Sequence, residues 1–262
     1  MTLYELLICA VAGVGAGLGT GFAGMSAANV ISPMLIAFLG VDPYAAIGIA
    51  LASDVLASAV SALTYSKHKN IDIQNGSIMM ASVLFFTFLA SWVSSFFPSR
   101  TVGMFAVYMT LFTGLRFLFR PVMTTKETLE QIGPKKRLVQ SIVCGAFIGS
   151  ICGFVGAGGG MMMLLILTGV LGYELKTAVG TSVFIMTFTA LTGSISHFTI
   201  AGGVSHWGYL IACALFTFAF AQLGALIANR STPKTLNRAT GLLLTVLGIV
   251  IVAVSFVQTH RF

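Results

Sequence analysis

Two segments rich in glycine and other small residues, 21–29 and 153–160, suit close contact with an anion. Glycine lets a ligand approach the backbone, and an apolar run of helical character follows each segment. A helix that starts there presents free N–H groups and the positive end of its dipole, so two such starts can bind an anion without Lys or Arg. The candidate binding residues are Gly24, Met25, Ser26 and Asn29 in the first segment and Gly156, Ala157, Gly158, Gly159 and Gly160 in the second.

Hydroxyl groups in the apolar run 174–200 are further candidate donors to an anion. Thr181 and Ser182 lie together in this run, although Ser and Thr in helices more often bond back to their own helix. The glycines of the two segments also have a second use, because small residues let membrane helices pack closely. Both roles can hold together, so the pattern alone does not separate them.

Asp54 and His197 are the titratable candidates. Asp54 lies in the middle of the apolar run 43–66, where insertion of a carboxylate costs about 2.5–3.5 kcal/mol unless it faces the protein interior. We expect either a proton-coupling or gating group, or a carboxyl that hydrogen-bonds a neighbouring helix. His197 lies further along the run 174–200 and is either a pH-sensitive group, a gate or, as we favour, an interface histidine.

The elements that hold these residues are apolar runs that recur from end to end of the chain. Of its 262 residues 57% are hydrophobic and only 8% are charged, and the mean hydropathy is +0.98. A soluble domain carries about 25% charged residues, so the composition excludes a soluble globular protein, and its apolar richness excludes a disordered one. The pattern predicts an all-α polytopic membrane protein.

Two of the apolar runs, 28–39 and 160–171, have only 12 residues each. A helix of that length rises about 18 Å, whereas a span needs roughly 20 residues. We therefore expect a broken or re-entrant helix pair around each glycine-rich segment. The predicted runs are 4–21, 28–39, 43–66, 77–97 and 102–119 in the first half, and 138–153, 160–171, 174–200, 206–228 and 236–257 in the second.

The two halves match without a gap when the chain is shifted by 132 residues, which predicts an internal duplication. This offset lays Gly21-Phe22 on Gly153-Phe154 and also lays Leu39-Gly40 on Leu171-Gly172. Each half holds five runs, an odd number, so the halves are expected to be inverted relative to each other, as in many secondary transporters. The expected domains are a first repeat, 1–120, a cytoplasmic linker, 121–137, and a second repeat, 138–262.

The basic residues support this topology. If the linker lies inside the cell, 12 of the 14 Lys and Arg fall inside and only Arg100 and Arg261 fall outside, as the positive-inside rule expects. Both termini are then periplasmic. Despite a net charge of +7, the basic residues form no face for nucleic acid. The four cysteines lie singly in apolar runs, so neither a metal site nor a cofactor is expected.

The chain resembles the TauE/SafE sulfite exporter family, also called the 4-toluene sulfonate uptake permeases. The residues that carry the resemblance are Gly153, Gly156, Gly158-Gly159-Gly160, Gly180-Thr181-Ser182, His197 and Gly202. The first half departs from the pattern, because Met25-Ser26-Ala27-Ala28 replaces the glycine run. The resemblance implies transport of small sulfur oxyanions or organosulfonates across the bacterial inner membrane.

We therefore expect a secondary transporter that moves sulfite or an organosulfonate, such as 4-toluenesulfonate or sulfoacetate, by alternating access, with proton coupling as an added hypothesis. Its expected partners are this small anion and membrane lipid; a homodimer follows only from the general frequency of symmetric oligomers. An anion channel stays open as the alternative. An intramembrane serine protease is a weaker alternative, because it requires Ser26 and His197 within hydrogen-bond reach.

Overall fold

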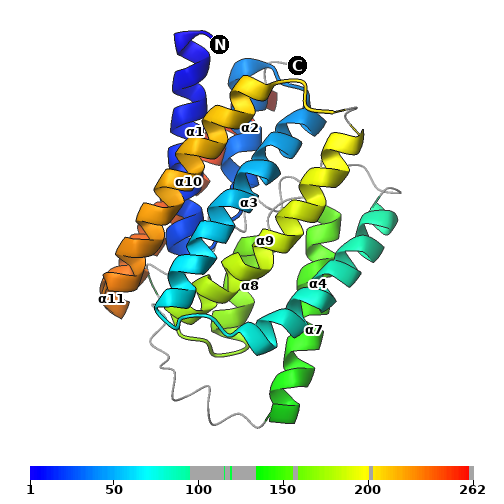
Figure 1. Cartoon of the computed structure of the whole chain (residues 1–262), viewed down its shortest axis with the longest axis vertical. Coiled ribbons are helices and arrows are strands. Elements are labelled where there is room, and N and C mark those ends of the chain that lie inside the picture. The colour runs from blue at the N-terminus through cyan, green and yellow to red at the C-terminus, as the bar shows by residue number, and fades with distance from the viewer. Residues whose placement is uncertain (95–114, 116–118, 120–133, 156–158, 201–202, 260–262) are drawn as a thin grey trace.

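The described part of the molecule is a bundle of α-helices (Figure 1). The structure, a computed structural model, describes residues 1–94, 115, 119, 134–155, 159–200 and 203–259. Its described helices are α1 (Leu3–Ala23), α2 (Ala28–Leu39), α3 (Pro43–Lys67), α4 (Ile73–Ser94), α7 (Pro134–Val155), α8 (Gly159–Gly169), α9 (Leu175–Ile200), α10 (Trp207–Arg230) and α11 (Pro233–Thr259). Most of the predicted run 102–119 lies outside the described residues.

The predicted fold class, an all-α polytopic membrane protein, is confirmed. Five of the described helices, α1, α3, α4, α9 and α10, contain segments long and apolar enough to cross a membrane. The two short predicted runs are helices α2 and α8, of 12 and 11 residues. Helix α7 begins at Pro134, inside the predicted linker, because proline is tolerated in the first turn of a helix.

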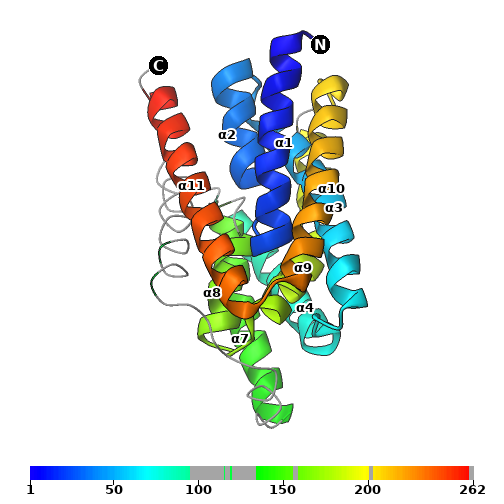
Figure 2. The same cartoon turned by 90° about the vertical axis from the view of Figure 1, so that its left-hand side faces the viewer.

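Helices α1 and α2 form an antiparallel hairpin that turns back inside the bundle. They lie side by side, and the start of α1 and the end of α2 are at the same end of the molecule (Figure 2). Gly40 ends α2 in the left-handed conformation (φ +62°), which glycine adopts without strain. The short helix α2 therefore returns to the side from which α1 enters, and the break between them lies among the other helices.

The most extensive helix–helix contacts join the two halves of the chain. Helix α1 packs along α10, α4 along α7, and α3 along α9. The first predicted run of each half thus packs on the fourth predicted run of the other half, in both directions. This reciprocal pairing is the one expected of two halves related by a twofold axis.

Glycines allow the helices to approach closely in two of these pairs, α1 with α10 and α4 with α7. A Cβ added at Gly17 of α1 would meet the backbone oxygen of Thr217 in α10, and one added at Gly149 of α7 would meet the backbone oxygen of Val83 in α4. The offset that matches the two halves in sequence also lays Gly17 on Gly149. We call these two contacts, α1 with α10 and α4 with α7, the glycine seams.

The ends of the bundle differ in charge. The start of α1 and the end of α11 lie at one end, and the connections from α3 to α4, α8 to α9 and α10 to α11 lie at the other (Figures 1 and 2). Six described basic residues are in or beside these connections, at Lys67, Lys69, Lys176, Arg230, Lys234 and Arg238, and three more, Lys135, Lys136 and Arg137, are in the first turn of α7. Near the same connections, Lys176 Nζ donates to the Asn229 carbonyl oxygen at 2.8 Å.

Candidate functional site

Helix α1 stops inside the bundle at Gly24. This residue has φ +58°, and its N–H donates to the Thr20 carbonyl oxygen while the next N–H, of Met25, donates to Gly19. The bond from Gly24 to Thr20 is that of an αL C-cap, which glycine favours because its φ is positive. A break inside the bundle is acceptable only if its remaining polar groups find partners there.

Four side chains satisfy carbonyl groups at and just beyond the end of α1. Three of them come from α3, α11 and α9, and the fourth comes from α1 itself. The bonds run from Tyr65 Oη to Gly21 O at 2.9 Å, from Thr240 Oγ1 to Phe22 O at 3.4 Å, from Ser182 Oγ to Gly24 O at 3.2 Å and from Thr20 Oγ1 to Met25 O at 2.8 Å. The break is therefore a built feature, held in position by both halves of the chain.

Asp54, at the middle of α3, lies at the start of α2. Ser26 Oγ donates to Asp54 Oδ2 at 2.7 Å, Ser58 Oγ donates to Oδ1 at 3.0 Å, and the Ala27 N–H also donates to this carboxyl. The side chain is 1% exposed. All three groups can donate to an ionised carboxylate, which only accepts hydrogen bonds. The predicted interior position of Asp54 is thus observed.

Most of the N–H groups at the first break already have partners within the protein. The Met25 N–H bonds the Gly19 carbonyl, and that of Ala27 bonds Asp54. The Ala28 N–H lies 3.4 Å from Ser26 Oγ, and that of Asn29 donates to the Ser26 carbonyl at 3.2 Å. An external anion at this helix start must therefore displace an internal acceptor.

The start of α8 lies directly on the first break. A Cβ added at Gly160 would meet the Gly24 carbonyl oxygen, and it would lie 3.0 Å from the Ser26 nitrogen. It would also meet Met186 Sδ, from α9. The two short helices therefore begin against each other, as the glycine-rich segments predicted. We call Gly24, Ser26, Asp54, Gly160 and Ser182 the junction.

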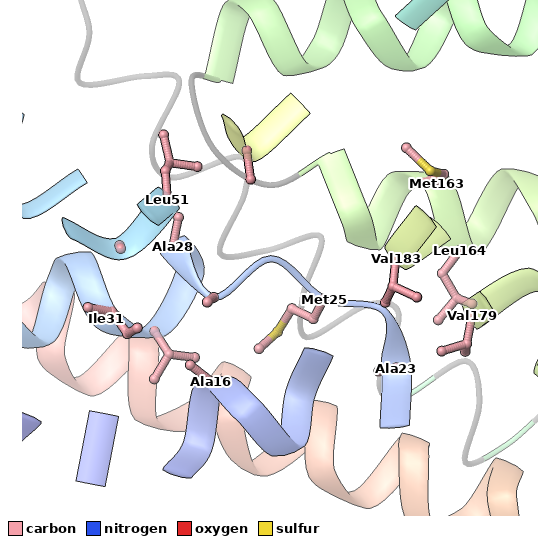
Figure 3. Close-up of a cluster of buried hydrophobic side chains, with 14 of the residues drawn as sticks. Ala16, Ala23, Met25, Ala28, Ile31, Leu51, Met163, Leu164, Val179 and Val183 are labelled. Atoms are coloured by element: carbon pink, nitrogen blue, oxygen red, sulfur yellow. The ribbon is translucent and has the colours of Figure 1, made fainter. Parts of the chain in front are cut away.

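An apolar shell surrounds the junction. Met25 points into the core from the loop between α1 and α2, with Val179 and Val183 of α9 nearby (Figure 3). Met25 and Ser182 are fully buried, and Ser26 is 5% exposed. The junction is thus closed to solvent in this structure, and a low-dielectric surrounding strengthens each of its polar contacts.

Of the other predicted binding residues, some lie beside the junction and some lie away from it. Thr181 faces away from it, because its Oγ1 accepts from the Asp72 N–H in the connection between α3 and α4, at 3.1 Å. Asn29 is only partly buried, in the first turn of α2. Gly159 begins α8, next to Gly160. Gly156, Ala157 and Gly158 lie outside the described residues.

His197 lies far from the junction along its own helix. It is four helical turns beyond Ser182 in α9, which corresponds to about 22 Å. Ser26, the nucleophile of the protease hypothesis, bonds Asp54 and Ala28 instead of a histidine. A serine nucleophile needs an adjacent base, so this geometry offers no support for a Ser–His pair.

Sequence reasoning missed three residues that contact the junction or hold it in place. Ser58 follows Asp54 by about one helical turn, and this spacing could have marked it as a partner of the carboxyl. Met186 corresponds to Asp54 at the offset that matches the two halves, so the predicted duplication could have indicated its position. Tyr65, which bonds the end of α1, carries no comparable signal, because its partner is a backbone carbonyl 44 residues away.

Comparison with known proteins gives one family and several relatives. The model of the family "Sulfite exporter TauE/SafE" matches residues 9–251. The chain is 27% identical over 255 residues to the probable membrane transporter protein YunE of Bacillus subtilis, covering 92% of this chain and 93% of that protein. It is 26% identical over 217 residues to the probable membrane transporter protein MJ0441 of Methanocaldococcus jannaschii, covering 78% of this chain and 77% of the relative.

Proposed function

The chain belongs to the TauE/SafE sulfite exporter family of membrane transporters, and from this premise we propose that it carries a small sulfur-containing anion by alternating access. The substrate class is sulfite or an organosulfonate such as 4-toluenesulfonate or sulfoacetate. The observation that carries the proposal is the meeting of two helix starts at the junction, with Gly160 against Gly24 and Ser26. Helix starts inside a transporter bundle are suited to anionic substrate groups.

The substrate site of this proposal is the junction and the glycine-rich segment before α8. Ser26, Ser182 and the N–H groups at 25–29 and 157–161 supply donors, and the glycines leave room beside the backbone. Asp54 acts in coupling or gating. The donors bind the oxygens of a tetrahedral sulfonate or of sulfite without a permanent positive charge, so that the substrate can also leave.

In this proposal, the bodies that move during alternating access are pairs of packed helices, and not the two halves of the chain. The glycine seams hold α1 against α10 and α4 against α7, backbone to backbone, and each seam joins the two halves of the chain. The seams support two bodies that keep their internal packing while they move around α3 and α9. The closed junction corresponds to an occluded state between the two open ones.

We further propose that the protein lies in a bacterial inner membrane with both termini in the periplasm. The support is the gathering of the described basic residues at the end of the bundle opposite the start of α1. Cytoplasmic loops carry an excess of Lys and Arg. Within this topology the halves 1–120 and 138–262 are inverted repeats, and the reciprocal glycine seams support that arrangement.

Counterflow in liposomes that contain the purified protein tests the function. Vesicles are preloaded with sulfite, 4-toluenesulfonate, sulfoacetate, sulfate or chloride, and the entry of labelled substrate is followed. We expect one sulfonate or sulfite to accelerate entry, whereas sulfate and chloride leave it unchanged. Flux without acceleration by internal substrate would instead indicate a channel, and the absence of flux for every anion would contradict the proposed substrate class.

A further inference from the structure

The positive end of α2 is occupied by the protein's own carboxylate. Asp54 accepts the Ala27 N–H at this helix start and the hydroxyl of Ser26 just before it. Ala27, the N-cap residue of α2, provides no side-chain cap, and its own N–H bonds a carboxylate from α3. A carboxylate and a sulfonate present the same kind of oxygen to such donors.

No second charge in the described part of the chain is bonded to Asp54. Ser26, Ala27 and Ser58 are the groups that bond it, and all three are neutral. Helix α2 has no titratable side chain, and none of those on the other described elements packed against α3 has a hydrogen bond to Asp54. They are Tyr4, Glu5 and Cys9 on α1, Lys176 and His197 on α9, and Tyr209, Cys213 and Arg230 on α10, with Tyr44, Tyr65 and Lys67 on α3 itself.

Two anions cannot share these donors. At a separation of a few ångströms in a low-dielectric interior, two negative charges repel by much more than thermal energy. We infer, resting on the proposed function, that Asp54 holds the anion position at the start of α2 while substrate is absent, and that substrate takes this position together with a proton on Asp54. The protein is then an anion–proton symporter.

The charges balance in this exchange. The empty site holds one negative charge, on the Asp54 carboxylate. The loaded site holds one negative charge, on a monovalent sulfonate, while a proton from solvent forms an O–H bond on Asp54. The interior therefore carries the same charge in both states, and the transport of a monovalent anion with one proton moves no net charge across the membrane.

Calorimetric titration of the purified full-length protein with 4-toluenesulfonate, a monovalent anion, measures the proton directly. This anion stays ionised between pH 6 and 8, so its own protonation does not contribute. Titrations in two buffers of different ionisation enthalpy give the number of protons taken up per bound anion. We expect about one proton, and an apparent Kd that rises by about tenfold for each pH unit where empty Asp54 is ionised.

Asp54→Asn, with Asp42→Asn as the matched control, assigns the proton to its residue. Asparagine has nearly the same shape and cannot titrate, so the ratio of Kd at pH 8 to Kd at pH 6 should fall to about one and proton uptake should vanish. Asp42 is exposed before α3, where it accepts the Ala45 N–H. Asp42→Asn should keep the pH dependence of the unmodified protein.

The outcomes separate this inference from the proposed function. Unmodified protein that binds and exchanges a sulfonate with no proton uptake would overturn the symport and leave the transporter. An unchanged pH ratio in Asp54→Asn would also overturn it. Absence of binding and exchange for every anion would instead remove the proposed function. If Asp54→Asn does not fold, the proton count of the unmodified protein still decides.

Discussion

The two sides of the junction lie at matching places in the sequence and differ in chemistry. On one side, Asp54 of α3 lies at the start of α2 and bonds Ser26. On the other, Met186 of α9, which corresponds to Asp54 in the duplicated sequence, lies at the start of α8 against Gly160. The offset that matches the two halves thus pairs a carboxylate with a thioether.

This difference indicates that the two sides of the junction have different roles. On the α2 side, a carboxylate and hydroxyl groups form the hydrogen bonds, so this side is sensitive to charge. The side of α8 has glycine and a flexible apolar side chain, which adapt to shape instead of charge. We expect substitutions at the two sides to change different properties, and the following experiments test that expectation in order of decreasing effect.

Gly160→Val should have the largest effect, because both sides of the junction meet at this residue. A side chain there collides with the Gly24 carbonyl and Met186, and the backbone of Gly24 cannot move freely. We expect counterflow to fall by about a hundredfold, which corresponds to about 3 kcal/mol. Gly208→Val is the control, since an added Cβ meets only Met1 Sδ at 3.6 Å; similar losses in both would contradict the contact.

Leucine at each of the two corresponding positions should separate charge from shape. Asp54→Leu leaves the Ser26, Ser58 and Ala27 donors buried without an acceptor and should cost about 3 kcal/mol of folding stability. Met186→Leu conserves volume and should cost less than about 1.5 kcal/mol. Thermal unfolding in detergent compares them, and equal losses would remove the proposed asymmetry.

Ser182→Ala and Thr181→Val should distinguish two adjacent hydroxyls. Ser182 donates to Gly24 at the junction, so its loss should weaken substrate affinity by about fivefold, or about 1 kcal/mol. Thr181 bonds Asp72 outside the junction, and its loss should lower stability without changing affinity. The half-saturating substrate concentration in counterflow is the measurement, and a larger change for Thr181→Val would place the substrate elsewhere.

His197→Gln should have the smallest effect. The residue lies about 22 Å along α9 from Ser182, beyond direct contact with a small anion at the junction. We expect the counterflow rate to stay within about twofold, the size of effect usual for a substitution away from special contacts. A loss of more than tenfold with normal folding would instead support the gating hypothesis for His197.

The helices were predictable from sequence because membrane spans are encoded locally. The apolar run 28–39 coincides with α2, and the run 43–66 differs from α3 by one residue at its end. Hydrocarbon length and the obligation to bond every backbone group leave few alternatives for such runs. The contact of Gly160 with Gly24 and Ser26 was also expected, because the predicted inverted repeat brings the two glycine-rich segments together.

The side-chain hydrogen bonds of the junction were not predictable in the same way. The bond between Ser26 and Asp54 depends on the rotation of α3 about its axis, and a chain that is apolar on nearly every face sets this rotation weakly. For the same reason Thr181 and Ser182 looked equivalent in sequence, although one helical step turns them towards different partners. Contacts between distant residues decide these roles.

The glycine seams also affect how the protein is made. Helix α1 leaves the ribosome early, but its partner α10 follows only after roughly 180 further residues, about 10–40 s at 5–20 residues per second. During that interval the glycine face of α1 has no native surface to pack on. Neither half can complete its packing alone, so the bundle can assemble only after most of the chain has been inserted, and a chain truncated before α10 leaves α1 without its partner.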